Sequence, residues 1–373
     1  MIFSPFPVGR GLLVVGDREL VVRVTLDTDC NCLVCNYPPS DFSIYGMRGE
    51  SVSLLDVRLF SDGNSLAAER IDDLRIWEIG GGKVGVGDTS IGELTGRDGP
   101  PTRLRLAKQG QQVFELERAV KSQIEFAGGV DLARPVLLRN GSRLFSREGR
   151  IVVELADDEE DDALWLAVSL AFGHLCWKRA EVRSRSLIVV YQQSIKLSGT
   201  KGALPFSIVQ NGWVDDDRIT TGVKTVMECA LDALHDDKGA DNTHTLEWLT
   251  RWFLAARSVE GLLDFRAMSL FSFLEVVDGR RTLDGAGLAE LLKISLDAAK
   301  ALVKVRNGIV HGSRNLEQAL REQPILDELF FGEFLVGDFA ARPAATLMNY
   351  LVGKTNEIML GRIGCDLAPA RWV

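Results

Sequence analysis

The chain has 373 residues, 46% of them hydrophobic and 25% charged, which is ordinary for a globular protein long enough for two domains. The formal net charge of −9 argues against broad nucleic-acid binding driven by bulk charge, although an RNA-cleaving pocket needs only local positive charge. Six cysteines do not suggest a disulfide framework, and we see neither a secretory signal nor an apolar stretch long enough for a bilayer. We therefore expect reduced thiols, no membrane contact and a cytoplasmic location.

The first half of the chain has the pattern of a β-rich domain. Residues 11–15 and 19–24 are β-branched runs around Gly16-Asp17, which predicts a hairpin. Short strands are also expected at residues 51–60, 73–79, 103–107, 113–116, 150–155 and 186–191. Turn signals such as Gly80-Gly81-Gly82 separate them, so we expect an antiparallel sandwich or a barrel-like sheet.

A helix is expected at residues 163–177, after the acidic run 157–162 and before Lys178 and Arg179. Acids at the start of a helix and bases at its end complement the helix dipole, which accounts for the run without a cation site. The basic group Lys178, Arg179, Arg183 and Arg185 is interpreted as a solvated face.

Beyond residue 215 the periodicity becomes helical. We expect helices at residues 222–234, 243–258, 261–277, 285–293, 296–310, 316–331 and 343–363. The predicted fold class is therefore α+β, with a β-rich domain at residues 1–214 and an all-α domain at residues 215–373.

The helix at residues 296–310 carries the chemistry. Its polar residues Lys300, Lys304, Asn307 and His311 follow helical spacing and form one stripe, whereas Leu302, Val305 and Ile309 take the opposite, inward face. Gly312 suits a helix C-terminus and would place His311 in the last turn. Arg306 supplies a guanidinium for phosphate oxygens, and His311 supplies an imidazole that moves protons near neutral pH.

The segment from Arg306 to His311 resembles the Arg-polar-x3-His signature of the HEPN superfamily of helical domains. Upstream, residues 246–253 resemble the aromatic helix of larger bacterial members, and residues 269–275 resemble the next helix, where an acidic residue closes an apolar run. The resemblance covers residues 215–365. A β-rich region ahead of such a domain is similar in outline to ApeA-type bacterial anti-phage proteins.

The resemblance implies a metal-independent endoribonuclease without cofactors, in which two subunits build one composite site for RNA. His311 would act as general base or acid, Arg306 would stabilise charge at phosphorus, and Asn307 would orient the histidine or bind the phosphate. Lys300 and Lys304 would contact RNA, and the products would be a 2′,3′-cyclic phosphate and a 5′-hydroxyl. The β-rich domain would sense an unknown trigger or restrain the nuclease. The alternative is a non-catalytic dimerisation or RNA-binding scaffold.

The motif poses a geometric problem, because Arg306 and His311 lie about 140° apart on an ideal helix. Either the helix distorts at Gly308, or the arginine of one subunit works with the histidine of the other.

Three weaker patterns have ordinary explanations beside the functional ones. Cys30, Cys32 and Cys35 would bind zinc only if His174 or Cys176 supplied a fourth ligand, and reduced cysteines in a strand are the alternative. Residues 80–88 are rich in glycine but lack the ending of a phosphate loop, which favours a turn. His235 and His244 flank a polar loop and are expected to be exposed rather than to bind metal.

Overall fold

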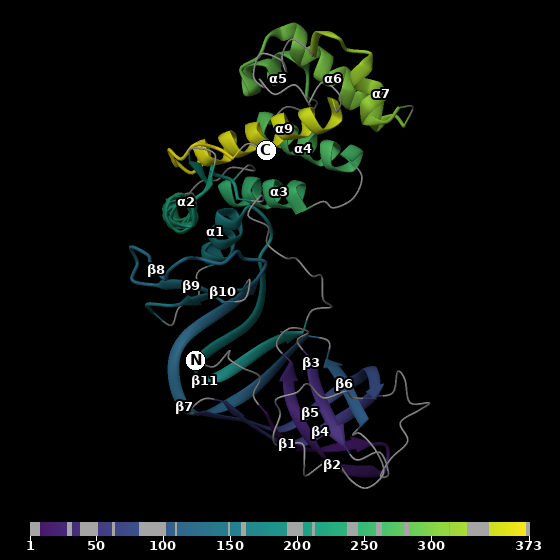
Figure 1. Cartoon of the computed structure of the whole chain (residues 1–373), viewed down its shortest axis with the longest axis vertical. Coiled ribbons are helices and arrows are strands. Elements are labelled where there is room, and N and C mark those ends of the chain that lie inside the picture. The colour runs from purple at the N-terminus through teal and green to yellow at the C-terminus, as the bar shows by residue number, and fades with distance from the viewer. Residues whose placement is uncertain are drawn as a thin grey trace. The chain divides into compact units, whose positions relative to one another are not determined.

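The computed structural model describes residues 8–27, 32–37, 51–61, 64–81, 102–108, 110–147, 150–157, 162–191, 204–210, 213–236, 245–258, 263–279, 283–312, 314–326 and 343–370. The chain forms two compact units. Unit 1 comprises Met1–Ala127, Val152–Asp158 and Lys178–Leu197, and unit 2 comprises Gly128–Ile151, Glu159–Trp177 and Ser198–Val373. The α+β class is confirmed, with β-rich structure first and helices after it (Figure 1). The division differs from a single boundary at residue 215, because two earlier segments pack with the helices of unit 2.

Six strands of unit 1 form a closed antiparallel barrel. They are β1 (Val8–Val15), β2 (Arg18–Asp27), β3 (Cys32–Tyr37), β4 (Ser51–Ser61), β5 (Asn64–Gly81) and β6 (Thr102–Lys108). The pairing runs β1-β2-β3-β6-β5-β4, and β4 pairs with β1 to complete the circle. The hairpin predicted around Gly16-Asp17 is confirmed by the pairing of Val15 with Arg18. Gly80 and Gly81, expected in a turn, instead extend β5 and pair with β6.

Closure of the barrel depends on a close approach between β1 and β4. A Cβ atom at Gly9 would lie 1.6 Å from the carbonyl oxygen of Arg58, so only glycine fits there. The register between the two strands shifts between Arg10 and Leu12, a bulge of the kind that bends a sheet toward closure. Alternate side chains then fill the interior, including Leu13 and Leu54, which are almost fully buried.

Three further strands lie wholly or mainly in unit 1, namely β7 (Gly110–Ala127), β10 (Arg150–Glu154) and β11 (Trp177–Tyr191). β7 pairs with β5, β10 and β11. The start of β11 corrects the helix predicted for residues 163–177. That helix, α1 (Asp162–Phe172), ends before Gly173, whose φ of +70° terminates the helical path.

Lys178 and Arg179 therefore lie in β11 and not in the last turn of a helix. Lys178 and Arg183 both pair with Glu181, whose side chain is only 7% exposed. Burial raises the pKa of Glu181, but the hydrogen bonds and charges of these two partners outweigh it and hold the pKa below its ordinary value. Part of the basic group is thus an ion-pair cluster around a buried carboxylate and not a solvated face.

Unit 2 is built from α1 and seven further described helices. They are α2 (Asp216–Asp236), α3 (Leu246–Ser258), α4 (Leu263–Asp278), α5 (Gly285–Leu292), α6 (Leu296–Val310), α7 (Leu316–Arg321) and α9 (Pro343–Arg362). α4 packs on α3, α6 and α9, and α5 and α7 pack on α6. Unit 2 also contains β8 (Val136–Leu137), β9 (Arg143–Arg147), β12 (Val209–Gln210) and β13 (Trp213–Val214). None of the helices in the described ranges is sufficiently long and apolar to cross a bilayer.

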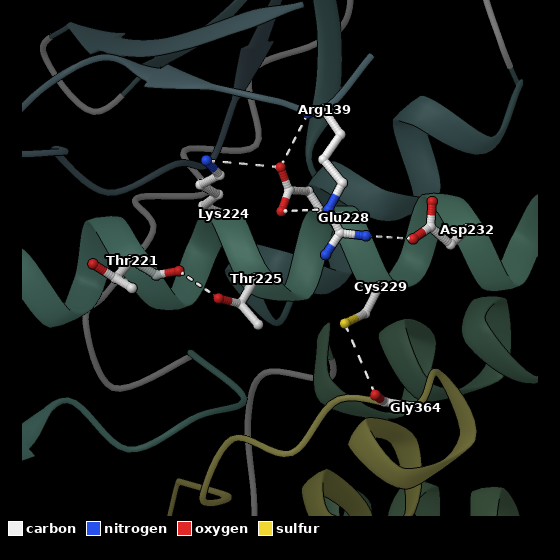
Figure 2. A network of polar contacts seen from close by, with 8 residues as sticks. All are labelled: Arg139, Thr221, Lys224, Thr225, Glu228, Cys229, Asp232 and Gly364. Atoms are coloured by element: carbon white, nitrogen blue, oxygen red, sulfur yellow. Dashed lines mark hydrogen bonds and ion pairs between the residues drawn. The ribbon is translucent and has the colours of Figure 1, made fainter. Parts of the chain in front are cut away.

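A buried carboxylate on α2 anchors the turn between β8 and β9 (Figure 2). Glu228, 9% exposed at its side chain, accepts the backbone N–H of Arg139 at 3.0 Å. The Arg139 guanidinium lies 3.4 Å from the other oxygen of Glu228 and 2.9 Å from Asp232. The turn is therefore attached to α2 through both backbone and side chain.

Candidate functional site

α6 has clear start and stop signals in the sequence, and the structure follows them. The Ser295 hydroxyl accepts the N–H of Ala298 at 3.2 Å and caps the start of the helix. His311 is the C-terminal cap and donates its N–H to the carbonyl of Asn307 at 3.0 Å. Gly312 follows with a φ of +72°, which glycine adopts readily. The predicted bounds 296–310 and the position of His311 at the helix end are confirmed.

The two faces of α6 separate as the spacing predicts. Lys300, Lys304 and His311 are exposed and Asn307 is half-buried, so the polar stripe is on the accessible face of the helix. On the opposite face Leu302 and Val305 are completely buried, whereas Ile309 is only half-buried. The five polar and cationic positions at 300, 304, 306, 307 and 311 all belong to this one helix.

Arg306 is held by groups on two helices. Its Nη2 makes a close ion pair with the Glu275 carboxylate on α4, and its Nη1 donates to Asn307 Oδ1 at 2.9 Å. The side chains of Arg306 and Glu275 are 24% and 25% exposed, so the pair lies at the edge of the helical packing. The sequence offers only a weak signal for this contact, namely an acidic residue that closes an apolar run, and Glu275 was not among the expected site residues.

Arg306 and His311 are not brought together within one chain. α6 remains helical through Gly308, where an added Cβ would meet Ala319 at an ordinary 3.5 Å. The option of a helix distorted at Gly308 is therefore wrong. The Oδ1 atom of Asn307 accepts a hydrogen bond from Arg306, so this oxygen is used for the arginine rather than for orienting the imidazole of His311. On this undistorted helix Arg306 and His311 keep the angular separation of about 140° of an ideal helix.

The zinc hypothesis finds little support in the strand that carries two of its cysteines. Cys32 and Cys35 are buried in β3, and residues three apart on a strand point to opposite faces. Burial, and then the neighbouring Cys32, raise the pKa of the Cys35 thiol and disfavour the thiolate that zinc requires. Cys30 lies outside the described residues. Among those described, no group of three or more His, Cys, Asp or Glu side chains is arranged to hold a metal.

The remaining histidines and the glycine-rich stretch add no catalytic geometry. His174 Nδ1 contacts the carbonyl oxygen of Phe172 at 2.9 Å, and burial lowers the pKa of this imidazole. His235 is exposed at the end of α2, while His244 lies outside the described residues. Of the glycine-rich residues 80–88, only the first two are described.

Arg257, the basic residue in the last turn of α3, has a structural role. Arg257 Nε donates to the carbonyl of Gly173 at 2.8 Å, just beyond α1, and Arg257 also bonds to Asn356. Burial, followed by the charge of Arg266, lowers the pKa of Arg257 to about 10. This guanidinium links the end of α1 to α9 and is not part of the α6 face.

No family model, no curated protein and no solved structure matches this chain.

Proposed function

We propose that the protein is a metal-independent endoribonuclease of the HEPN type, whose active site combines the α6 helices of two subunits. The single observation behind the proposal is the accessible α6 face, on which Lys300, Lys304 and His311 are exposed beside an arginine oriented by Glu275. Such a face offers cations for a phosphodiester backbone and an imidazole with access to solvent. The resemblance of residues 306–311 to the family motif supplies the reaction class.

In the proposed reaction, His311 of one subunit accepts the proton of a ribose 2′-hydroxyl, and the 2′-oxygen attacks the adjacent phosphorus. The bond from phosphorus to the 5′-oxygen breaks, and the leaving oxygen receives a proton from His311 of the second subunit. The products are a 2′,3′-cyclic phosphate and a 5′-hydroxyl.

Arg306 would stabilise the negative charge that develops on the phosphoryl oxygens. A guanidinium has about five N–H donors. Glu275 and Asn307 occupy two of these, so the others remain for a phosphate. Glu275 would act as a positioning residue that holds the guanidinium in place. Asn307 would bind phosphate through its side-chain amide N–H groups, because only its Oδ1 is used by Arg306.

A nuclease that cuts cellular RNA has to be restrained, so we place this one in the cytoplasm in a toxin-like or phage-defence role, with the β-rich region as the part that senses a trigger. This part of the proposal rests on the outline shared with ApeA-type proteins and on the chemistry of unrestrained RNA cleavage.

The test is to incubate the purified full chain with tRNA and total RNA in EDTA and to identify the new ends. We expect cleavage that leaves cyclic phosphates and that is lost in His311→Ala and Arg306→Ala, both still folded. His235→Ala, which removes an exposed imidazole from α2, is the matched control and should cleave normally. Cleavage that persists in His311→Ala would overturn the assignment.

A non-catalytic scaffold is the second candidate, and the Arg306–Glu275 pair is the observation that favours it, since a neutralised guanidinium serves helix packing equally well. Sedimentation with and without RNA separates the two. A dimer that binds RNA without cutting it, with unchanged binding in His311→Ala, identifies the scaffold.

A further inference from the structure

A cavity of about 330 Å³ opens in unit 2 where α4, α5 and α9 end. Its apolar wall consists of Val277, Leu291 and Ile358, all half-buried. Its volume lies at the lower end of the range of about 300–1,000 Å³ that small-molecule sites occupy. None of the residues on α6 discussed above lines it.

The charges around this cavity are strongly unequal. Lys293, Lys354 and Arg362 line it together with a single carboxylate, that of Glu357. Lys354 Nζ lies 3.2 Å from Glu357 and 5.8 Å from the centre of the Tyr350 ring, and these contacts hold the ammonium in place. The Lys354 side chain is 19% exposed. Lys293 and Arg362 have no ion-pair partner within the described ranges. Three cations and one carboxylate leave an excess of about two positive charges, the complement of a phosphomonoester at neutral pH.

Lys293 occupies a backbone position that favours glycine. Its φ of 55° and ψ of 48° are left-handed, a conformation disfavoured by about 1 kcal/mol or more for residues with a Cβ. The N–H groups of Lys293 and Ile294 both donate to the Ala289 carbonyl, so the end of α5 is capped by backbone alone. The lysine side chain is not needed for that cap and remains available at the cavity.

We propose that this cavity binds a small phosphomonoester that carries an apolar group. The phosphate contacts Lys293 and Arg362, Lys354 adds a third positive charge to the lining, and the apolar group packs against Val277, Leu291 and Ile358. Charge-assisted hydrogen bonds supply the affinity for the phosphate, and the aliphatic wall discriminates against inorganic phosphate.

Gly361 provides a way to fill the cavity without straining the helix. It lines the cavity from the last turn of α9, and an added Cβ would meet no atom within 4 Å. Leucine is also a better helix former than glycine. Gly361→Leu should therefore fold normally and occupy the space of the apolar group.

The experiment is a calorimetric titration of the full chain with 1-naphthyl phosphate, with 1-naphthol and inorganic phosphate as partial ligands. We expect 1-naphthyl phosphate to bind at least about tenfold more tightly than either partial ligand, because both halves of the site contribute. Gly361→Leu should abolish binding. Lys293→Gly should weaken it about tenfold while the unfolding temperature stays the same or rises, because glycine suits that backbone conformation.

Arg321→Met is the matched control for Arg362→Met, since both arginines lie in the last turn of a helix and Arg321 is outside the cavity. Only Arg362→Met should weaken binding. Equal losses in both variants would indicate general attraction of anions and overturn the proposal. Unchanged binding in Gly361→Leu, or equally tight binding of inorganic phosphate, would overturn it as well.

Discussion

Two arginine–carboxylate clusters of unit 2 use the same chemistry in different surroundings. Around Glu228 the carboxylate is 9% exposed and accepts a backbone N–H of the β8–β9 turn in addition to the Arg139 guanidinium (Figure 2). Around Arg306 the two partners are about a quarter exposed and are joined by side chains alone. The first cluster fixes the path of the backbone, whereas the second fixes only the direction of a guanidinium.

The difference matters because a buried charge without its partner is far more unfavourable than one that can be hydrated. We infer that the Glu228 cluster contributes more to stability than the Arg306 cluster does. The following predictions test that contrast.

The largest expected effect is on the Glu228 cluster. Glu228→Ala should lower the free energy of unfolding by about 2 kcal/mol, because it removes the acceptor of a backbone N–H in the β8–β9 turn. Urea unfolding measures this change. Asp232→Ala removes a partner that is 63% exposed and should change the stability by less than about 1 kcal/mol. Equal effects of the two substitutions would contradict a structural role for Glu228.

The Arg306 cluster should show a smaller effect on stability. Glu275→Gln and Arg306→Ala should each lower the free energy of unfolding by about 1 kcal/mol, because water can hydrate the remaining group. A double-mutant cycle between the two positions measures their coupling. If the proposed function is correct, Glu275→Gln should also reduce RNA cleavage beyond its effect on stability. The same cycle between Arg139 and Glu228 is the comparison. An equally large coupling energy for the two pairs would contradict the difference proposed between the two clusters.

A third carboxylate, that of Glu181 in unit 1, predicts how the stability of the protein depends on pH in the acidic range. Its pKa is lowered in the folded state, so its contribution to stability is complete above the ordinary value of about 4.5 and is lost as the pH falls through the folded-state value. The unfolding free energy of the native chain should therefore decrease more steeply below about pH 4.5 than that of Glu181→Gln. Parallel pH profiles would show that Lys178 and Arg183 do not stabilise this carboxylate.

The smallest expected effect on stability is that of His311→Ala. The imidazole is exposed and the cap is made by backbone groups, so the free energy of unfolding should change by no more than about 0.5 kcal/mol. Thermal unfolding measures it. A large loss would mean that His311 is a structural residue and would weaken its assignment to catalysis.

Local signals predicted α6 and the hairpin around Gly16-Asp17 well, because Ser295, Gly312 and the turn residues act on neighbouring backbone. They failed at residues 173–185, where Gly173 ends α1 early and β11 begins among charged residues. Pairing with Lys178 and Arg183 offsets the burial of Glu181 in that charged strand, and this burial depends on the fold of unit 1.

The contact between Glu275 and Arg306 is equally nonlocal. It joins residues 31 positions apart and requires α4 to pack on α6, so neither helix alone predicts it. The cavity beside α5 needs three helix ends to meet and leaves no pattern in the sequence. The part of the candidate site that could be predicted is the part that lies on one helix.

The closed circle of β1–β6 has a consequence for any molecule that unit 1 recognises. Where a strand has neighbours on both sides, another molecule cannot add a strand there by backbone hydrogen bonding. Among the described residues, the stretch 18–22 of β2 pairs with β1 alone, so strand addition is restricted to such short stretches. Over the rest of the barrel, recognition has to use the shape and chemistry of outward-facing side chains, such as the exposed Phe60.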